Sequence, residues 1–159
     1  MMKTMMKFSG LFILLFTFST SAQNLKTAIA SIGCKQIKVS DIKPMNISQS
    51  DFENWQKQTF QIQSKQSFIA KCKAKDGLFY KVLFEEETFA DKSTASARLP
   101  KIKQLPPKEH DKSDLAVPIL LREGFQFKNK IYTVGNFAYG VYLEGNVKIW
   151  RDKLQKKIR

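Results

Sequence analysis

The sequence contains few of the residue types that build enzyme and cofactor sites. Of its 159 residues, two are cysteine and one is histidine. Zinc sites need several Cys, His or carboxylate ligands that converge, and no such set is recognisable here. The chain also lacks a Gly-x-Ser-x-Gly sequence and a glycine-rich phosphate loop ending in Gly-Lys-Ser/Thr. We therefore expect neither a metal nor a cofactor.

The single histidine, His110, is the one candidate for catalysis. It lies between Glu109 and Asp111, but consecutive side chains project in different directions, so these three groups do not converge on one ion. The surrounding stretch is charged, contains proline and shows no periodicity, which predicts a mobile surface loop near residues 101–114. His110 is then an ordinary solvated residue. The alternative is a small secreted hydrolase or nuclease with His110 in its active site.

Long hydrophobic runs are also absent. The longest apolar stretch, Phe8–Phe18, is shorter than the roughly 20 residues that span a bilayer. Lys3 and Lys7 precede it, and small residues at Thr20 and Ala22 follow it, which is the pattern of a secretory signal peptide. Residues 1–22 are predicted to be removed, which leaves a single domain over residues 23–159, exported to the periplasm or the medium; an uncleaved anchor is the alternative.

Export bears on the two cysteines. In an oxidising compartment, Cys34 and Cys72 are expected to form a disulfide, which would close a loop of about 39 residues, worth about 4 kcal/mol in the chain-entropy description. Because Gly33 precedes Cys34, lipid attachment at Cys34 is an alternative. Ser31 instead of leucine at position minus three, and the distance from the apolar run, disfavour it.

Negative charge is scarce. The chain has 27 Lys and Arg against 14 Asp and Glu, a net charge of +13 that becomes +11 once Lys3 and Lys7 are removed. Such an excess favours an acidic partner, either an acidic protein or an anionic component of the cell envelope. Export argues against nucleic acid as the natural ligand. A basic surface that serves only solubility is the competing interpretation.

The stretch Ser67–Glu87 predicts the central hairpin of the fold. Apolar residues recur at every second position from Phe68 to Ala74 and alternate with Lys71, Lys73 and Lys75, so one face is buried and the other wet. Asp76-Gly77 suits a two-residue type I′ turn. Further strands are expected over residues 35–40 and 60–63, and a second hairpin over 125–134 with Asn129 in the left-handed turn position.

Short helices are expected to pack on one face of this sheet, giving an α+β domain. One runs between Asn24 as N-cap and Gly33 as C-cap, and a capping box at Ser50–Glu53 opens another. Asp91 is expected to cap a third, which carries Ala95, Leu99 and Ile102 and which Pro100 ends or kinks.

The C-terminal segment predicts an amphipathic helix. Its apolar stripe, three and four residues apart, is Val147, Trp150, Leu154 and Ile158, with Asn146 as cap. Four lysines lie off that stripe: Lys148, Lys153, Lys156 and Lys157. A strand over 147–150 is the alternative.

Together these features favour an exported, non-catalytic binding or inhibitor-like protein that uses the basic helix to engage its acidic partner. A stacking platform for bases or sugar rings is a second possibility, because many aromatic residues alternate with lysines near the C-terminus. The aromatic residues concerned are Phe125, Phe127, Tyr132, Phe137, Tyr139, Tyr142 and Trp150. A sheet-and-helix core needs the same residues, and we favour the core.

We predict that His110→Ala changes the free energy of unfolding by less than about 0.5 kcal/mol, because substitutions on a solvated loop rarely do more. Urea unfolding of the mature protein measures this. Loss of a hydrolytic activity in the variant would instead establish the enzyme interpretation.

Overall fold

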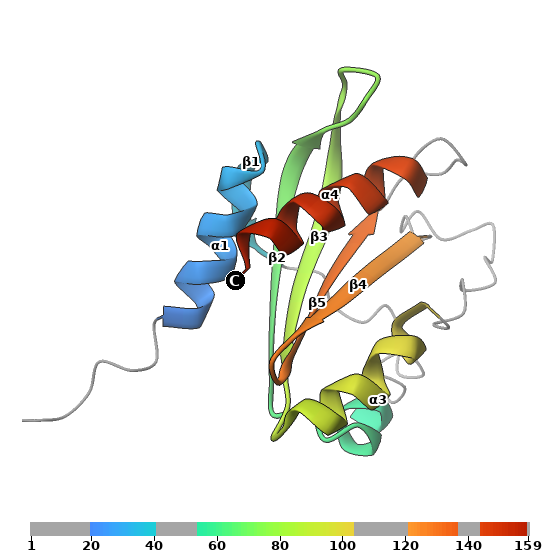
Figure 1. Cartoon of the computed structure of the whole chain (residues 1–159). Coiled ribbons are helices and arrows are strands. Elements are labelled where there is room, and N and C mark those ends of the chain that lie inside the picture. Colours follow the sequence, from blue (N-terminus) through green and yellow to red (C-terminus); the bar gives the residue numbers. More distant parts are fainter. Residues whose placement is uncertain (1–19, 41–53, 104–120, 137–143, 159) are drawn as a thin grey trace, which may run out of the picture.

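The fold of the computed structural model is an antiparallel sheet with helices on both faces (Figure 1). The structure describes residues 20–40, 54–103, 121–136 and 144–158. Its sheet has the order β1-β2-β3-β5-β4. The strands are β1 (Lys35–Val39), β2 (Ser64–Lys73), β3 (Phe79–Thr88), β4 (Leu121–Phe127) and β5 (Lys130–Asn136). The labelled helices are α1 (Thr20–Ser31), α3 (Lys92–Lys103) and α4 (Glu144–Lys157), and a short helix covers residues 54–59.

The predicted central hairpin is confirmed. β2 and β3 pair from Ser64↔Thr88 to Lys73↔Phe79, and β3 lies in the middle of the sheet between β2 and β5. The predicted type I′ turn is wrong, because only Gly77 has a positive φ, +84°. Ala74 N–H donates to Leu78 O, and Gly77 N–H donates to Ala74 O, so the loop contains three residues with glycine in the left-handed position.

One face of the sheet packs against α1 and α4, as expected. The inward side chains of β2 and β3, such as Phe68 and Phe84, meet the apolar stripe of α4. That stripe is buried throughout: Val147, Trp150, Leu154 and Ile158 are at most 3% exposed. Residues 147–150 lie within the helix α4, so the alternative strand is wrong. α4 begins at Glu144, so Asn146 lies inside its first turn and is not the cap.

The disulfide is confirmed within this core. Cys34 and Cys72 are joined, with an S–S distance of 1.98 Å, and both are buried. The bond links the exit of α1 to the end of β2. Gly33, with φ +89°, ends α1 as expected, and a disulfide-bonded Cys34 excludes the lipid alternative. α1 starts at Thr20, so Asn24 is not its N-cap.

The opposite face carries α3 and the helix at 54–59. Asp91 caps α3 by accepting a hydrogen bond from Thr94 N at 2.7 Å, and the helix continues through Pro100 to Lys103. Ala95 and Ile102 pack with Ile131 of β5 in a second cluster. The expectation that both early helices share one face holds for α1 alone, because Gln56 of the helix at 54–59 bonds Arg98 of α3.

Two smaller expectations are also corrected. Residues 60–63 are not a strand: Ile62 N bonds Lys57 O, and Gln61 has φ +51°, so the chain turns there at the end of the helix. In the β4–β5 hairpin, Lys128 with φ +55° takes the left-handed position, while Asn129 donates its amide to Phe89 O at 2.6 Å.

Some expectations fall outside the residues that the structure describes. These are most of the predicted signal peptide, the capping box at Ser50–Glu53, and the loop near 101–114 beyond Lys103, which closes α3. Among the described helices, none has the length and apolar character needed to cross a membrane.

Trp150→Ala should lower the free energy of unfolding by about 3–5 kcal/mol, because its ring is 2% exposed and its removal leaves a large cavity. Trp55 is 55% exposed and supplies the matched control: Trp55→Ala should cost less than about 1 kcal/mol. Urea unfolding compares the two. Equal losses would show that α4 does not depend on this contact.

Candidate functional site

The acidic side chains that the structure describes, which do not include that of Glu144, are buried or make a local bond. Four glutamates are buried: Glu85, Glu86, Glu87 and Glu123. Three further carboxylates are exposed, and each accepts a local hydrogen bond. Asp76 accepts from Leu78 N in the β2–β3 turn, Asp91 from Thr94 N at the start of α3, and Asp152 from Arg151. By contrast, most described lysines are exposed.

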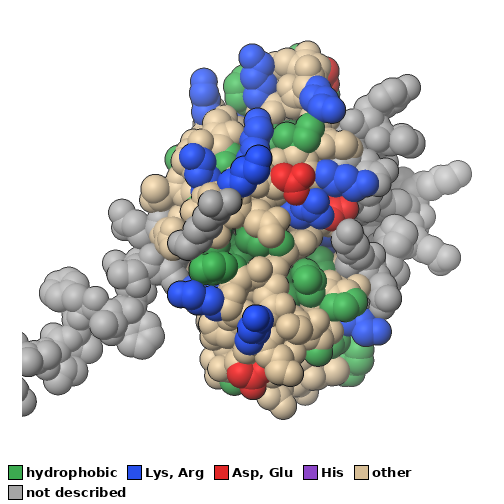
Figure 2. All heavy atoms as spheres, viewed as in Figure 1, with side chains coloured by type: hydrophobic (Ala, Val, Ile, Leu, Met, Phe, Trp, Pro, Cys, Tyr) green, Lys and Arg blue, Asp and Glu red, His purple; other side chains and the backbone are tan. Residues whose placement is uncertain are grey.

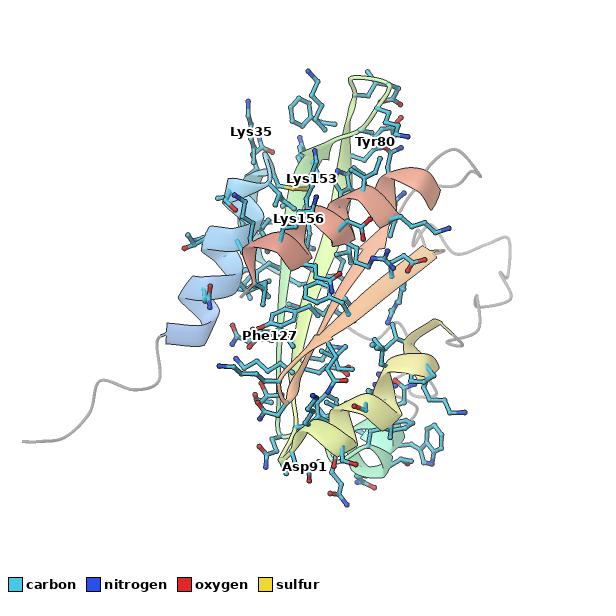
Figure 3. The ribbon with its side chains drawn as sticks, viewed as in Figure 1. Lys35, Tyr80, Asp91, Phe127, Lys153 and Lys156 are labelled. Atoms are coloured by element: carbon cyan, nitrogen blue, oxygen red, sulfur yellow. A yellow bond between two sulfur atoms is a disulfide. The ribbon has the colours of Figure 1, made fainter. Side chains whose placement is uncertain are left out.

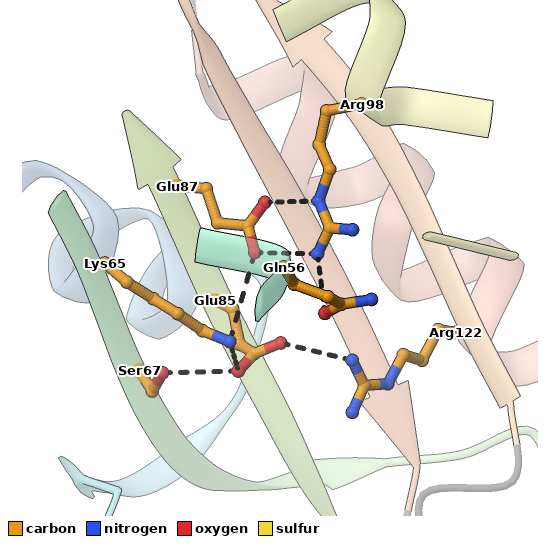
Figure 4. A network of polar contacts seen from close by, with 7 residues as sticks. All are labelled: Gln56, Lys65, Ser67, Glu85, Glu87, Arg98 and Arg122. Carbon is orange, nitrogen blue, oxygen red and sulfur yellow. Dashed lines mark hydrogen bonds and ion pairs between the residues drawn. The ribbon is translucent and has the colours of Figure 1, made fainter. Parts of the chain in front are cut away.

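Glu85 and Glu87 anchor a polar network on the α3 face of the sheet (Figure 4). Lys65 Nζ of β2 lies 2.9 Å from Glu85 Oε1, and Arg122 Nη1 of β4 lies 3.8 Å from Glu85 Oε2. Burial alone would raise the pKa of Glu85, but the charges of Lys65 and Arg122 outweigh it and hold that pKa below its ordinary value.

Arg98 fastens α3 to this network. Its Nε and Nη2 donate to the two carboxylate oxygens of Glu87 at 3.0 and 3.1 Å, the forked geometry of a strong ion pair. Nη2 also lies 3.4 Å from Gln56 Oε1, and the guanidinium carbon lies 4.9 Å from the centre of the Phe60 ring. Each charge in the network thus meets a partner that helps to position a helix or strand. This arrangement indicates a structural role.

Glu86 points to the other face, where it is equally enclosed. Lys130 Nζ of β5 lies 2.9 Å from its Oε1, and Gln66 donates to the same oxygen at 3.4 Å. Burial and the nearby Glu86 carboxylate raise the pKa of Tyr132, which also bonds Glu86. Glu123 of β4 is bound by Arg151 of α4 at 2.7 Å.

The lysines predicted for binding lie on the outer side of α4. Lys148, Lys153, Lys156 and Lys157 are all exposed, and the buried stripe holds the helix that carries them against the sheet. Figure 3 shows Lys153 and Lys156 projecting from α4, with Lys35 on the neighbouring β1. Lys and Arg side chains gather in the upper half of this face, over α4 and the hairpin (Figure 2).

A second group of lysines lies where the β2–β3 hairpin turns. Pairing places Lys71 directly opposite Lys81 on one side and Lys35 on the other, a row across three strands on the face away from α4. Like charges directly opposite one another destabilise a sheet. We call this region the hairpin end and define it as Lys35, Lys71, Lys73, Lys75, Leu78, Phe79 and Lys81. All are exposed.

Three contacts brace the hairpin end against the core. The disulfide holds Cys34, next to Lys35, against β2. Trp150 Nε1 donates to Lys73 O at 3.1 Å, and Asn146 Oδ1 accepts a hydrogen bond from Lys75 N at 2.9 Å. The start of α4 therefore lies beside the hairpin turn on one face of the sheet, and the lysine row lies on the other face.

Sequence reasoning recognised the α4 lysines but missed both the buried carboxylates and the lysine row. The sequence did contain a signal for the buried carboxylates. Successive residues of a strand point to opposite faces, so a strand that contains Glu85, Glu86 and Glu87 places carboxylates on both faces of the sheet. The row depends on the pairing of β1 with β2, which no local pattern specifies.

The remaining candidates gain no support as a site. His110 lies outside the described residues, and among those described no group of three or more His, Cys, Asp or Glu could hold a metal ion. Of the aromatic residues weighed as a stacking platform, Phe125, Tyr132 and Trp150 are buried and Phe127 packs against the same core. Phe137, Tyr139 and Tyr142 fall outside the described residues.

Arg98→Met should destabilise the fold by about 3–5 kcal/mol, because it leaves the buried Glu87 carboxylate without its forked partner. Adding Glu87→Met should restore most of that loss. Asp152→Asn, which removes only an exposed ion pair, is the control and should cost less than about 1 kcal/mol. A double variant no more stable than Arg98→Met alone would contradict this account of the network.

The network also predicts a dependence on pH. Because the pKa of Glu85 is lower in the folded state than in the unfolded chain, its contribution is complete above the ordinary pKa of about 4.5 and is lost as the pH falls through the folded-state value. The free energy of unfolding should therefore fall in this acid range, and Glu85→Gln should make the fall shallower. Urea unfolding between pH 7 and pH 3 measures both curves; parallel curves would count against the prediction.

Comparison of the chain with known protein families, with curated proteins and with solved structures finds no match.

Proposed function

We propose that this protein is an exported, non-catalytic binding or inhibitor-like protein whose basic surface engages an acidic partner in the cell envelope or outside the cell. One observation carries the proposal: the carboxylates whose side chains the structure describes are buried or locally bonded, while the lysines of α4 and the hairpin end are exposed. A fixed array of one sign attracts partners of the other sign.

The lysine row argues against solubility as the only purpose of this charge. A surface selected for solubility is served by both signs interspersed, and it gains nothing from like charges placed opposite one another. Lys35, Lys71 and Lys81 occupy such positions on three adjacent strands. An acidic partner would bring opposite charge to all three lysines at once, so binding and local stability would be linked.

Export is supported by the disulfide. Bonds of this kind persist in oxidising compartments such as the periplasm and the extracellular medium, and here the bond lies in the core beside the basic surface. Together with the signal-peptide pattern at the start of the chain, the disulfide supports a partner in the cell envelope or in the medium.

The experiment is a charge reversal on α4. Changing Lys148, Lys153, Lys156 and Lys157 to glutamate should weaken binding to an acidic probe and flatten its salt dependence, because such contacts are screened over about 8 Å at physiological ionic strength. Polyglutamate and vesicles containing phosphatidylglycerol serve as probes, and circular dichroism verifies the fold.

A control reversal makes the same charge change at the other end of the molecule. It alters exposed lysines on the helix at 54–59, on α3 and in the β4–β5 turn: Lys57, Lys92, Lys101 and Lys128. This variant should bind clearly better than the α4 variant. Equal binding by the two would mean that only net charge matters, and the proposed surface would be wrong.

A further inference from the structure

We propose that the acidic partner is an anionic lipid surface and that the tip of the β2–β3 hairpin enters it, with Leu78 and Phe79 between the headgroups. This inference rests on the proposed function and names the partner class for the same basic surface. It starts from two apolar side chains that the fold leaves in water.

Leu78 and Phe79 are exposed although the core is close by. Leu78 is 61% exposed and Phe79 47%, and they are adjacent at the start of β3, directly after the turn. The turn itself is held by Asp76, which accepts hydrogen bonds from Leu78 N and from Tyr80 Oη, so both residues are presented on a defined loop. Because successive residues of a strand point to opposite faces, Leu78 and Phe79 expose apolar surface on both sides of the hairpin just after its turn.

Lysines flank this tip. Lys71, Lys73 and Lys81 lie on the face away from α4, and Lys75 lies in the turn, where its N–H donates to Asn146 of α4. Lys35 Nζ lies 5.5 Å from the centre of the Phe79 ring. Long lysine side chains can run along apolar surface while their ammonium groups reach phosphates, and each one near an anionic bilayer strengthens binding by roughly fivefold.

The shape of the tip favours a bilayer over an acidic protein. Stable protein interfaces bury about 800 Å² on each partner around a packed centre, and two side chains on a projecting turn do not form such a centre. A bilayer needs only a small apolar group that reaches about 5–10 Å into the boundary between headgroups and acyl chains, with positive charge around it. The hairpin end meets these requirements.

The tip is also rigid before it binds. The disulfide, the Trp150 bond to Lys73 and the Asn146 bond to Lys75 hold the hairpin end from two sides. An element that is ordered beforehand loses little conformational freedom on binding. The one carboxylate at the tip, Asp76, bonds Leu78 N and Tyr80 Oη on the α4 side of the hairpin, whereas Phe79 and the lysine row lie on the opposite face.

The test compares the mature protein with Leu78→Ser/Phe79→Ser in sedimentation with vesicles. Vesicles of phosphatidylglycerol mixed with phosphatidylcholine should bind the wild type, and phosphatidylcholine alone should not. The tip variant should bind the anionic vesicles at least about tenfold more weakly at physiological salt, because it lacks the apolar part of the interaction. The matched control, Val39→Ser/Trp55→Ser, removes exposed apolar side chains elsewhere and should bind as the wild type does; Val39 is 72% exposed and Trp55 55%.

A second measurement reports insertion directly. Phe79→Trp places an indole at the tip, and lipids brominated on their acyl chains should quench its fluorescence beyond any quenching of the wild type. If the tip variant binds anionic vesicles as well as the wild type and no extra quenching occurs, insertion is overturned. Binding to polyglutamate without binding to vesicles would overturn the lipid proposal and leave the proposed function standing, whereas binding to neither would overturn both.

Discussion

Three consecutive carboxylates on the central strand have to be neutralised from both faces of the sheet, and much of the architecture depends on how this is done. Each neighbouring element supplies a cation: Lys65 from β2, Lys130 from β5, Arg122 from β4 and Arg98 from α3. A buried charge without its partner costs several kcal/mol, so every alternative register or helix position that separates these pairs is disfavoured. The network therefore contributes to the specificity of the fold more than to its net stability.

The same arrangement determines the character of the surface. The acidic side chains that the structure describes are buried or make a local bond, whereas the lysines of α4 and the hairpin end are exposed. The disulfide and the two hydrogen bonds to α4 then hold the hairpin end, with Leu78 and Phe79 directly after its turn, against the core. Because each buried carboxylate is paired with a cation, these charges cancel, and the excess of Lys and Arg over Asp and Glu in the sequence remains for the surface.

Local patterns predicted the elements well and their assembly less well. The hairpin, the disulfide and α4 followed from alternation, cysteine count and helical spacing, and the α+β class followed from them. The position of the helix at 54–59 could not be predicted, because it depends on the contact of Gln56 with Arg98, 42 residues away. The lysine row likewise arises from the pairing of strands. The type of turn at Gly77 could not be predicted, because the dipeptide Asp76-Gly77 does not specify the length of the loop.

A titration of the isotope-labelled mature protein with short-chain phosphatidylglycerol, followed by nuclear magnetic resonance, tests the central claim most directly. It reports at each backbone amide where an anionic headgroup binds. The account predicts that the largest shifts fall on the hairpin end and α4, and that they fade as salt is added. Shifts centred on α3 and the helix at 54–59, or spread evenly over all exposed lysines, would contradict it.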